Sequence, residues 1–590
     1  MNPARFKVKG IAVSPGIIAG NAYVIRRHDV AVPQRVIEAG EIDQEIERFR
    51  AAIALSHEQL EDVRRKLGDE AGDHVLIVDT YRLLLKDDML TSGTEQIIRK
   101  RLVNAEWALQ IKVEEIRALF NKIEDAYIRE RKSDVDFVAE RVFKNFTPGE
   151  DEPFLTGLPP NAVVIAHDLS PADTATLPKF HVGAFATEIG GRTSHTAILA
   201  RSLGLPAVVG AEHLLGHVNT GDPVIVDGLT GTIIIHPHSD EFKLYLERRE
   251  RYEFSERQLA VYRHLPAETR DGHRIRLLTN IELPEEIPQA LEMGAEGVGL
   301  FRTEFLYMNR LDLPEEDEQF EYYRKVLEGM HPLPATIRTC DIGGDKIALS
   351  VPIERGANPA MGLRAVRLYR RFPDLFRTQI RGMLRASAHG KLKIILPLVT
   401  SVTEVLEARR IIREEQENLQ AEGYTIDLHV PVGVMIETPA ACMMADVLAR
   451  EADFFSVGTN DLIQYTLAVD RQDEHVAYLY EPLHPAILRM IKRVNDIAHE
   501  VGIPVSICGE MGGEEIYLLV LLGLKFDELS MNPRSIPRMK RLTRKIDFSR
   551  AEWMVQSILA LRTATDIDTF VRREMIHLFP EDFPEEIYRK

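Results

Sequence analysis

Residues 453–471 read Asp-Phe-Phe-Ser-Val-Gly-Thr-Asn-Asp-Leu-Ile-Gln-Tyr-Thr-Leu-Ala-Val-Asp-Arg. The apolar run Phe454–Val457 predicts a short buried strand, and a helical stretch follows the loop after it. The same strand-then-helix unit recurs throughout the chain beyond Gly272. About eight such units in about 310 residues predict a (β/α)8 TIM barrel. The other strand candidates are Ile275–Leu278, Gly297–Phe301, Thr336–Ile337, Lys393–Leu398, Val432–Ile436, Val505–Ile507 and Glu528–Ser530.

Charged and polar residues follow five of these strand candidates. A TIM barrel has its active site at the C-terminal ends of its strands, so these side chains are expected to converge on one rim. Any one of them alone is more often half of a structural ion pair, but five strand ends together indicate a site. The residues are Arg302-Thr303-Glu304, Arg338 with Asp341, Glu437, Gly458-Thr459-Asn460-Asp461 and Cys508-Gly509-Glu510.

The N-terminal half has a different organisation. Short strands are predicted in residues 1–30 and again from 162 to 235, whereas apolar residues at helical spacing begin at Ile42. Further helices are predicted near 74–86, 93–121 and 123–145, so a helical block is inserted into an α/β domain. The predicted domains are an α/β domain of residues 1–36 and 148–238, a helical domain of 37–147, a charged helical linker of 239–270 and the barrel of 271–590.

One loop of the α/β domain carries a candidate nucleophile. Residues 190–201 read Gly-Gly-Arg-Thr-Ser-His-Thr-Ala-Ile-Leu-Ala-Arg, after a strand that ends near Thr187. His195 is therefore predicted where the loop becomes a helix, and backbone N–H groups at a helix start favour an anion. A neutral imidazole is nucleophilic near pH 7, so His195 could accept a phosphoryl group. The alternative is a capped helix with a surface histidine.

The loop around His195 and residues 453–471 resemble the two signatures of the phosphoenolpyruvate-utilising enzymes. The first is similar to their phosphohistidine loop and the second to their metal and substrate loop. The order of the parts resembles the enzyme I family of the bacterial sugar phosphotransferase system. This resemblance extends from Gly10-Ile-Ala-Val-Ser-Pro-Gly16 to the last predicted barrel strand. It implies transfer of phosphoryl from phosphoenolpyruvate to His195, and then to a histidine of an HPr-like carrier protein.

The resemblance also implies roles for the residues of the barrel rim. Arg302, Arg338 and Arg471 match the substrate-binding arginines, and Asn460 matches a substrate contact. Two carboxylates, Glu437 and Asp461, match the ligands of Mg²⁺, which prefers hard oxygen donors. Cys508 matches the donor that protonates the enolate of pyruvate; the alternative is a small buried apolar residue. For Arg364 a helix-capping role is the alternative to substrate binding, and Lys346 is a candidate for reaching the phosphate.

Bulk properties restrict the class of protein. The chain has 590 residues, 45% hydrophobic and 28% charged, with a net charge of −18. That charge argues against nucleic-acid binding and favours a partner with a basic face. Three cysteines are too few for a disulfide framework, and no apolar run reaches the length of a membrane span or has the form of a signal peptide. A cytoplasmic enzyme is expected.

Several alternatives stay open from the sequence. A pyruvate phosphate dikinase or phosphoenolpyruvate synthase shares the phosphohistidine domain and the barrel but needs a nucleotide-binding domain. A nitrogen-branch enzyme I would serve a different carrier, and a scaffold protein could keep the fold without activity. The resemblance implies a homodimer through the barrel. Because His195 must meet both the barrel and a carrier, the linker is predicted to act as a hinge.

Overall fold

The computed structural model describes residues 5–25, 33–67, 81–82, 84–121, 132–146, 162–169, 182–190, 200, 204–307, 312–343, 358–471 and 475–583. The chain divides into two compact units, Met1–Ser255 and Glu256–Lys590. His195 and Lys346 lie outside the described residues. No helix within the described residues is long and apolar enough to cross a membrane.

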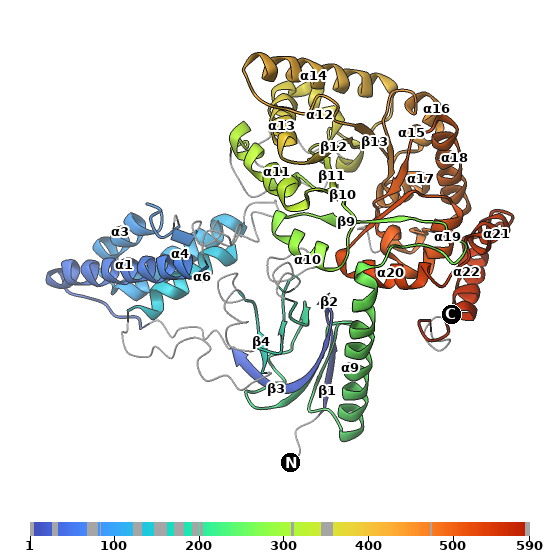
Figure 1. Cartoon of the computed structure of the whole chain (residues 1–590). Coiled ribbons are helices and arrows are strands. Elements are labelled where there is room, and N and C mark those ends of the chain that lie inside the picture. The colour runs from blue at the N-terminus through green and yellow to red at the C-terminus, as the bar shows by residue number, and fades with distance from the viewer. Residues whose placement is uncertain are drawn as a thin grey trace. The chain divides into compact units, whose positions relative to one another are not determined.

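The second unit is built on eight strands that close into a barrel, in the order β10-β11-β12-β13-β14-β15-β16-β9 (Figure 1). All eight neighbouring pairs are parallel. This confirms the predicted TIM barrel. The strands are β9 Arg276–Ile281, β10 Val298–Phe301, β11 Pro334–Arg338, β12 Lys391–Leu396, β13 Val432–Ile436, β14 Phe455–Val457, β15 Val505–Ile507 and β16 Glu528–Met531.

One predicted strand is displaced by two residues. The expected strand Lys393–Leu398 is observed as Lys391–Leu396. Pro397 has no N–H group to donate to the ladder, and Leu398 has a positive φ of 55°, so the chain leaves the sheet there. The apolar run in the sequence therefore continues past the end of the strand.

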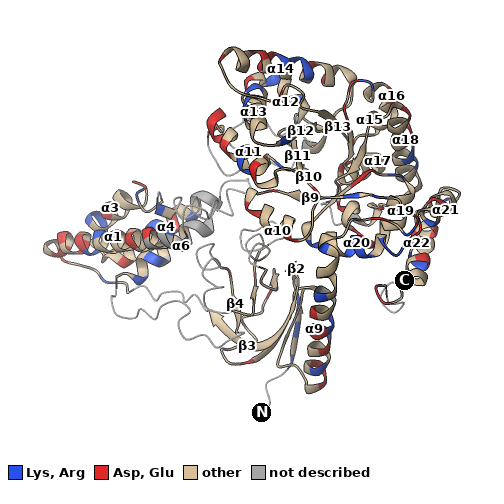
Figure 2. Cartoon of the chain, in the orientation of Figure 1, with Lys and Arg blue, Asp and Glu red and all other residues tan. Residues whose placement is uncertain are grey.

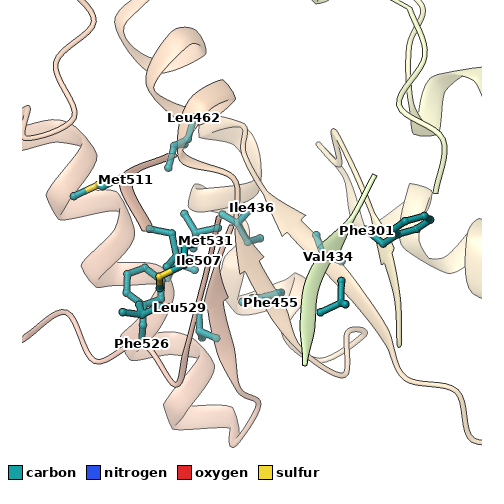
Figure 3. Packing of buried hydrophobic residues seen from close by; sticks show 14 of the residues in the cluster. Phe301, Val434, Ile436, Phe455, Leu462, Ile507, Met511, Phe526, Leu529 and Met531 are labelled. Atoms are coloured by element: carbon teal, nitrogen blue, oxygen red, sulfur yellow. The ribbon is translucent and has the colours of Figure 1, made fainter. Parts of the chain in front are cut away.

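Most of the longer helices of this unit bury one apolar stripe. In α18, Ile487, Leu488, Ile491 and Val494 recur at spacings of one, three and three residues and are buried. Figure 3 shows the packing of such buried side chains, with Val434, Ile436, Phe455, Ile507 and Leu529 contributed by the strands. The helices are α10 Ile287–Glu292, α11 Glu316–Met330, α12 Val366–Arg371, α13 Pro373–Ala386, α14 Val402–Ala421, α15 Pro439–Met443, α16 Ala445–Leu448, α17 Thr459–Leu467, α18 Pro485–Val501, α19 Leu518–Gly523, α20 Ile536–Thr543, α21 Phe548–Leu559 and α22 Ala564–Leu578.

The first unit contains an eight-stranded sheet with the order β1-β8-β7-β3-β4-β5-β6-β2. Strands from both flanks of the helical block pair with each other, since β3 lies between β7 and β4. The helical block is therefore inserted into an α/β domain, as predicted. The strands are β1 Phe6–Lys9, β2 Ile11–Ser14, β3 Ile17–Ile25, β4 Val163–Ala166, β5 Ala184–Thr187, β6 Ala207–Val209, β7 Pro223–Asp227 and β8 Thr232–Ile235.

The helical block has its own apolar core, which includes Phe49, Leu60, Leu109 and Val142. The prediction of one helix over 93–121 is wrong. Leu102 has a left-handed backbone, with φ 54°, and ends the first helix, and Val103 then forms a bridge with Val36. The described helices are α1 Ile42–Leu67, α3 Thr91–Arg101, α4 Ala105–Asn121 and α6 Lys132–Lys144, and much of the predicted 74–86 and 123–131 lies outside the described residues.

The predicted linker begins with a helix that belongs partly to the sheet. Helix α9, Ser239–Leu259, carries both signs of charge along its length (Figure 2). Near its start, Phe242 and Tyr245 pack against a core that includes Ile225 and Ile234. One turn later, Nη2 of Arg248 lies 3.2 Å from Oδ2 of the buried Asp227. The first half of α9 therefore covers one face of the sheet.

Candidate active site

Strand β11 ends in a buried ion-pair cluster. Arg338, its last residue, donates from Nη2 to Oε1 of Glu304 at 2.8 Å, and its Nη1 lies 3.2 Å from Oδ2 of Asp341. The backbone N–H of Asp341 donates to the same Glu304 oxygen. Burial by itself lowers the pKa of Arg338, but the carboxylates of Glu304 and Asp341 outweigh it and raise that pKa. Arg338 is thus a permanently charged, oriented cation at the rim.

The Nε atom of Arg338 is buried and has no hydrogen-bond partner within the described residues. A buried donor without a partner is costly, so an acceptor from a bound anion would be stabilising there. Arg302, which directly follows β10, is more accessible and donates from Nη1 to Oε1 of Glu282 at 2.7 Å. Both arginines therefore lie at strand ends where a substrate anion can meet a guanidinium group.

Arg364 joins two parts of the rim. Its Nε and Nη2 donate to the two carboxylate oxygens of Asp341 at 3.0 and 2.9 Å. Nη2 also lies 3.2 Å from Oδ2 of Asp461, and Nη1 donates to the Tyr465 hydroxyl. The side chain is almost fully buried. This geometry makes Arg364 a member of the site and not a helix cap.

Two carboxylates of the rim have the chemistry of a cation site. Glu437 directly follows β13, and its Oε1 accepts the N–H of Leu398 at 2.6 Å. Burial, together with the negative charges of Asp461 and Asp341, raises the pKa of Glu437 to about 8 despite Arg338 and Arg364. A divalent cation close to Glu437 would favour its ionised form, and carboxylate oxygens are the ligands that Mg²⁺ prefers. Within the described part of the chain, no cluster of three or more ligating side chains occurs.

Glycine at position 458 leaves room for this carboxylate. A Cβ placed there would lie 2.8 Å from Oε2 of Glu437 and 3.0 Å from its Cβ. Gly458 also precedes α17, whose first turn contains Asn460 and Asp461. Gly458 therefore leaves room for Glu437, and Asp461, whose charge acts on Glu437, lies in the first turn of the helix that follows.

Asn460 and Arg471 come from the two ends of α17. Asn460 accepts the N–H of Glu510 at 2.9 Å and donates to the Glu510 carboxylate at 3.3 Å, which ties the loop after β14 to the loop after β15. Ala468 ends α17 with a positive φ of 54° and turns the chain back. Nη2 of Arg471 then lies 3.9 Å from Oδ1 of Asp461. The structure thus brings both predicted residues to the rim.

Cys508 follows β15 and lies inside the barrel with Leu300, Ile395, Met435 and Phe454. Burial raises the pKa of its thiol to about 11. At neutral pH the sulfur therefore carries its proton. A protonated thiol at the rim of the barrel can act as an acid toward a carbanion held by the arginines.

The start of the predicted nucleophile loop is described, although His195 itself is not. Strand β5 ends at Thr187, whose hydroxyl donates to the carbonyl of Ile189 at 2.7 Å. Gly190 follows with a positive φ of 118°. The loop therefore leaves the C-terminal end of a parallel strand, the place expected for a phosphate-binding helix start.

Three members of the rim cluster received no individual role from the sequence: Glu304, Asp341 and Tyr465. The first two follow β10 and β11. The expectation that a TIM barrel has its site at the C-terminal ends of its strands drew attention to both residues but assigned neither of them a role. Tyr465 lies one turn after Asp461 on α17, and its hydroxyl donates to the carbonyl of Ala360 at 2.6 Å. Spacing of four residues along a helix was the signal that could have identified it.

Three family models match the chain. They are described as PEP-utilising enzyme, N-terminal, over residues 9–131; PEP-utilising enzyme, mobile domain, over 158–231; and PEP-utilising enzyme, PEP-binding domain, over 256–548. A phosphoenolpyruvate-protein phosphotransferase from Bacillus sp. (strain S) is 42% identical over 568 residues, which are 96% of this chain and 98% of that protein.

A protein of the same name from Bacillus subtilis (strain 168) is 41% identical over 567 residues, 96% of this chain and 99% of its own length. Among solved structures, an NMR solution structure of an Enzyme I protein is 37% identical and covers 42% of this chain and 99% of that chain, with a TM-score of 0.35.

Proposed function

We propose a function for this chain, which belongs to the family of phosphoenolpyruvate-protein phosphotransferases. It transfers the phosphoryl group of phosphoenolpyruvate to His195. From His195 the group passes to a histidine of a small HPr-like carrier protein, the first step of a sugar phosphotransferase system. The observation that carries this proposal is the convergence of arginines, two carboxylates and a protonated thiol at one end of the barrel.

The substrate has two anionic groups, a phosphate and a carboxylate. Planar guanidinium groups bind both with paired hydrogen bonds, so Arg302, Arg338 and Arg471 are the proposed substrate ligands. The unpartnered Nε of Arg338 supports this role. Asn460, at the start of α17, is a further proposed contact.

Enzymes of this family use a divalent metal, and we propose Mg²⁺ held by Glu437 and Asp461. The negative charges of Asp461 and Asp341 close to the buried Glu437 support a cation at this position. When bound, the ion neutralises negative charge on the substrate oxygens.

This chain's own residues then account for the remaining chemistry. The arginines hold the phosphoryl group in line with a ring nitrogen of His195, the P–O bond to the substrate breaks, and an N–P bond forms. The departing enolate of pyruvate takes the Cys508 proton on its methylene carbon, C2–O becomes a carbonyl, and water reprotonates the thiolate. Ketone formation makes the transfer favourable.

The setting of the enzyme is also a proposal. Cys340, Cys442 and Cys508 are all free, which supports a reducing compartment such as the cytoplasm. We propose a homodimer through the barrel and the domain boundaries predicted from the sequence, except that the first half of α9 belongs with the sheet. We also propose a hinge in the remainder of the segment 239–270.

Labelled phosphoenolpyruvate tests the proposal directly. Full-length protein incubated with [³²P]phosphoenolpyruvate and Mg²⁺ should acquire an acid-labile, base-stable label, as a phosphoramidate does, and should pass it to an HPr-like carrier. His195→Ala should stay unlabelled with its fold intact by circular dichroism. Acid-stable label, or label in His195→Ala, would contradict the assignment.

A further inference from the structure

Asn280 binds the backbone of Cys508 from another strand of the barrel. Its Nδ2 donates to the Cys508 carbonyl oxygen at 2.9 Å. Asn280 belongs to β9 and Cys508 follows β15, and β16 lies between these two strands. The amide therefore reaches across one strand to the end of the segment that carries the thiol.

Ser530 determines which end of this amide faces Cys508. The Ser530 hydroxyl donates to Oδ1 of Asn280 at 2.6 Å, so the oxygen end is directed toward β16 and the NH₂ end toward Cys508. Nδ2 also approaches the Ser530 carbonyl at 3.4 Å. Ser530 is fully buried, and a Cβ at Gly299 of β10 would overlap its side chain. The serine is therefore fixed in the position that orients the amide.

The rest of the Cys508 backbone is fixed as well. Its N–H donates to the carbonyl of Val457 at 3.1 Å, and its Sγ lies 3.7 Å from the same oxygen. The next residue, Gly509, has no room for a side chain because a Cβ there would overlap Thr459. With hydrogen bonds to both its N–H and its C=O, Cys508 has a fixed Cα–Cβ direction.

We propose that Asn280, oriented by Ser530, is the positioning residue that aims the Cys508 thiol at one face of the enolate. This inference rests on the proposed role of Cys508 as the proton donor. In that step the S–H proton moves to C3, the enolate electron pair forms the new C–H bond, and sulfur keeps the S–H electrons until water reprotonates it. Asn280 touches none of the reacting atoms, so it acts only through the direction of the thiol.

A purely structural role for Asn280 predicts a different result. If the amide only satisfied a buried carbonyl, its loss would lower stability and leave the stereochemistry of protonation unchanged. A positioning role predicts that the facial selectivity of methyl formation falls. It also predicts that the effect of Asn280 disappears once the thiol is absent.

The experiment uses the full-length protein and phosphoenolpyruvate that carries tritium stereospecifically at C3. The reaction runs in D₂O with Mg²⁺ and carrier, so that the methyl group of pyruvate contains all three hydrogen isotopes. The variants are Asn280→Asp, which keeps the size but lacks the NH₂ donor, Asn280→Ala, Ser530→Ala, Cys508→Ser and the double variant Asn280→Asp/Cys508→Ser. Turnover, KM for phosphoenolpyruvate, melting temperature and the chirality of the pyruvate methyl group are measured for each.

We expect Asn280→Asp and Asn280→Ala to lose about 10- to 100-fold in kcat, as for a misdirected reacting group. Facial selectivity should fall in both variants, and KM should change less than about twofold. The kcat and the facial selectivity of Ser530→Ala should lie between those of the Asn280 variants and those of the parent. The double variant should match Cys508→Ser. Full selectivity in both Asn280 variants, with selectivity lost in Cys508→Ser, would overturn the positioning role alone. Normal turnover and selectivity in Cys508→Ser would instead overturn the donor assignment, and this inference with it.

Discussion

Nη2 of Arg364 lies 3.2 Å from Oδ2 of Asp461. The same guanidinium forms a bidentate pair with Asp341, so one cation neutralises two carboxylates at the barrel rim. Arg364 thereby connects the segment before α12 to the first turn of α17. In the proposed site this pairing holds Asp461 in place for the metal, while Asp341 also lies 3.2 Å from Nη1 of Arg338.

Replacement of Arg364 should destabilise the barrel. Arg364→Met removes the bidentate partner of Asp341, which then keeps only Arg338, and leaves Asp461 with only Arg471 at 3.9 Å. The unfolding free energy of the barrel should therefore fall by about 3–5 kcal/mol. Arg364→Lys keeps the charge but loses the fork, and should lose less. Calorimetric melting of the full-length protein measures both.

The matched control is Arg370→Met on the neighbouring helix α12. Arg370 is exposed and pairs with Glu407 at 3.0 Å, so its loss should change the stability by no more than about 1 kcal/mol. Equal effects of Arg364→Met and Arg370→Met would show that the buried cluster contributes no special stability.

Loss of either proposed metal ligand should separate the two half-reactions. Glu437→Gln and Asp461→Asn each remove a charged oxygen ligand, so labelling by phosphoenolpyruvate should become independent of Mg²⁺ and fall by several orders of magnitude. Phosphoryl exchange between His195 and a phosphorylated carrier should continue, because that step does not use the barrel. Loss of exchange with labelling retained would place the metal elsewhere.

Gly458→Ala tests the space around Glu437. The added Cβ would lie 2.8 Å from Oε2 of Glu437, so the carboxylate must shift. We expect the Mg²⁺ concentration for half-maximal activity to rise about tenfold or more, with carrier exchange unchanged. Gly40→Ala is the control, since a Cβ at position 40 meets nothing within 4 Å. An unchanged Mg²⁺ requirement in Gly458→Ala would mean that Glu437 does not hold the ion as proposed.

The thiol of Cys508 should make the stability depend on pH only above the ordinary thiol pKa. Its folded-state pKa is raised by burial to about 11, so the folded protein favours the protonated thiol. This contribution is fully present below the ordinary thiol pKa of about 8.5 and is lost as pH rises from there to about 11. The melting temperature of the parent relative to Cys508→Ser should therefore decline across this window. A constant difference from pH 8 to 11 would contradict the raised pKa.

The barrel could be predicted from the sequence because its signals are local and repeated. Each buried strand is a short apolar run, and some rim residues directly follow one, as Glu437 follows Ile436 and Cys508 follows Ile507. Parallel strands align these ends automatically. The position of a side chain at the end of a strand therefore follows from the fold class alone.

The contacts between strand ends could not be predicted, because they depend on tertiary distances. Nothing in the sequence pairs Arg364 with Asp341, which lies 23 residues earlier, or Asn280 with Cys508, which lies 228 residues later. The break at Leu102 was missed for a related reason: the residues on both sides have good helical periodicity, and the left-handed turn is stabilised by Asn104 binding the backbone of Pro33 and Arg35.

A fragment of residues 1–259 should fold alone and work as a phosphoryl carrier domain, because the sheet and the helical block have their own cores. It should exchange phosphoryl with a phosphorylated HPr-like carrier and stay unlabelled by phosphoenolpyruvate. The end of the fragment matters, since Phe242 and Tyr245 of α9 cover Ile225 and Ile234 of the sheet.

A fragment ending at 238, the boundary predicted from the sequence, would expose that face and lose the Arg248–Asp227 pair. It should therefore melt at a lower temperature than 1–259 and bind a hydrophobic dye such as ANS. The double substitution Phe242→Ala/Tyr245→Ala within 1–259 should reproduce most of this loss, because it removes the covering side chains and keeps the helix. Equal melting temperatures for 1–238 and 1–259 would place α9 with the linker and not with the sheet. Labelling of either fragment by phosphoenolpyruvate would refute the separation of the two half-reactions.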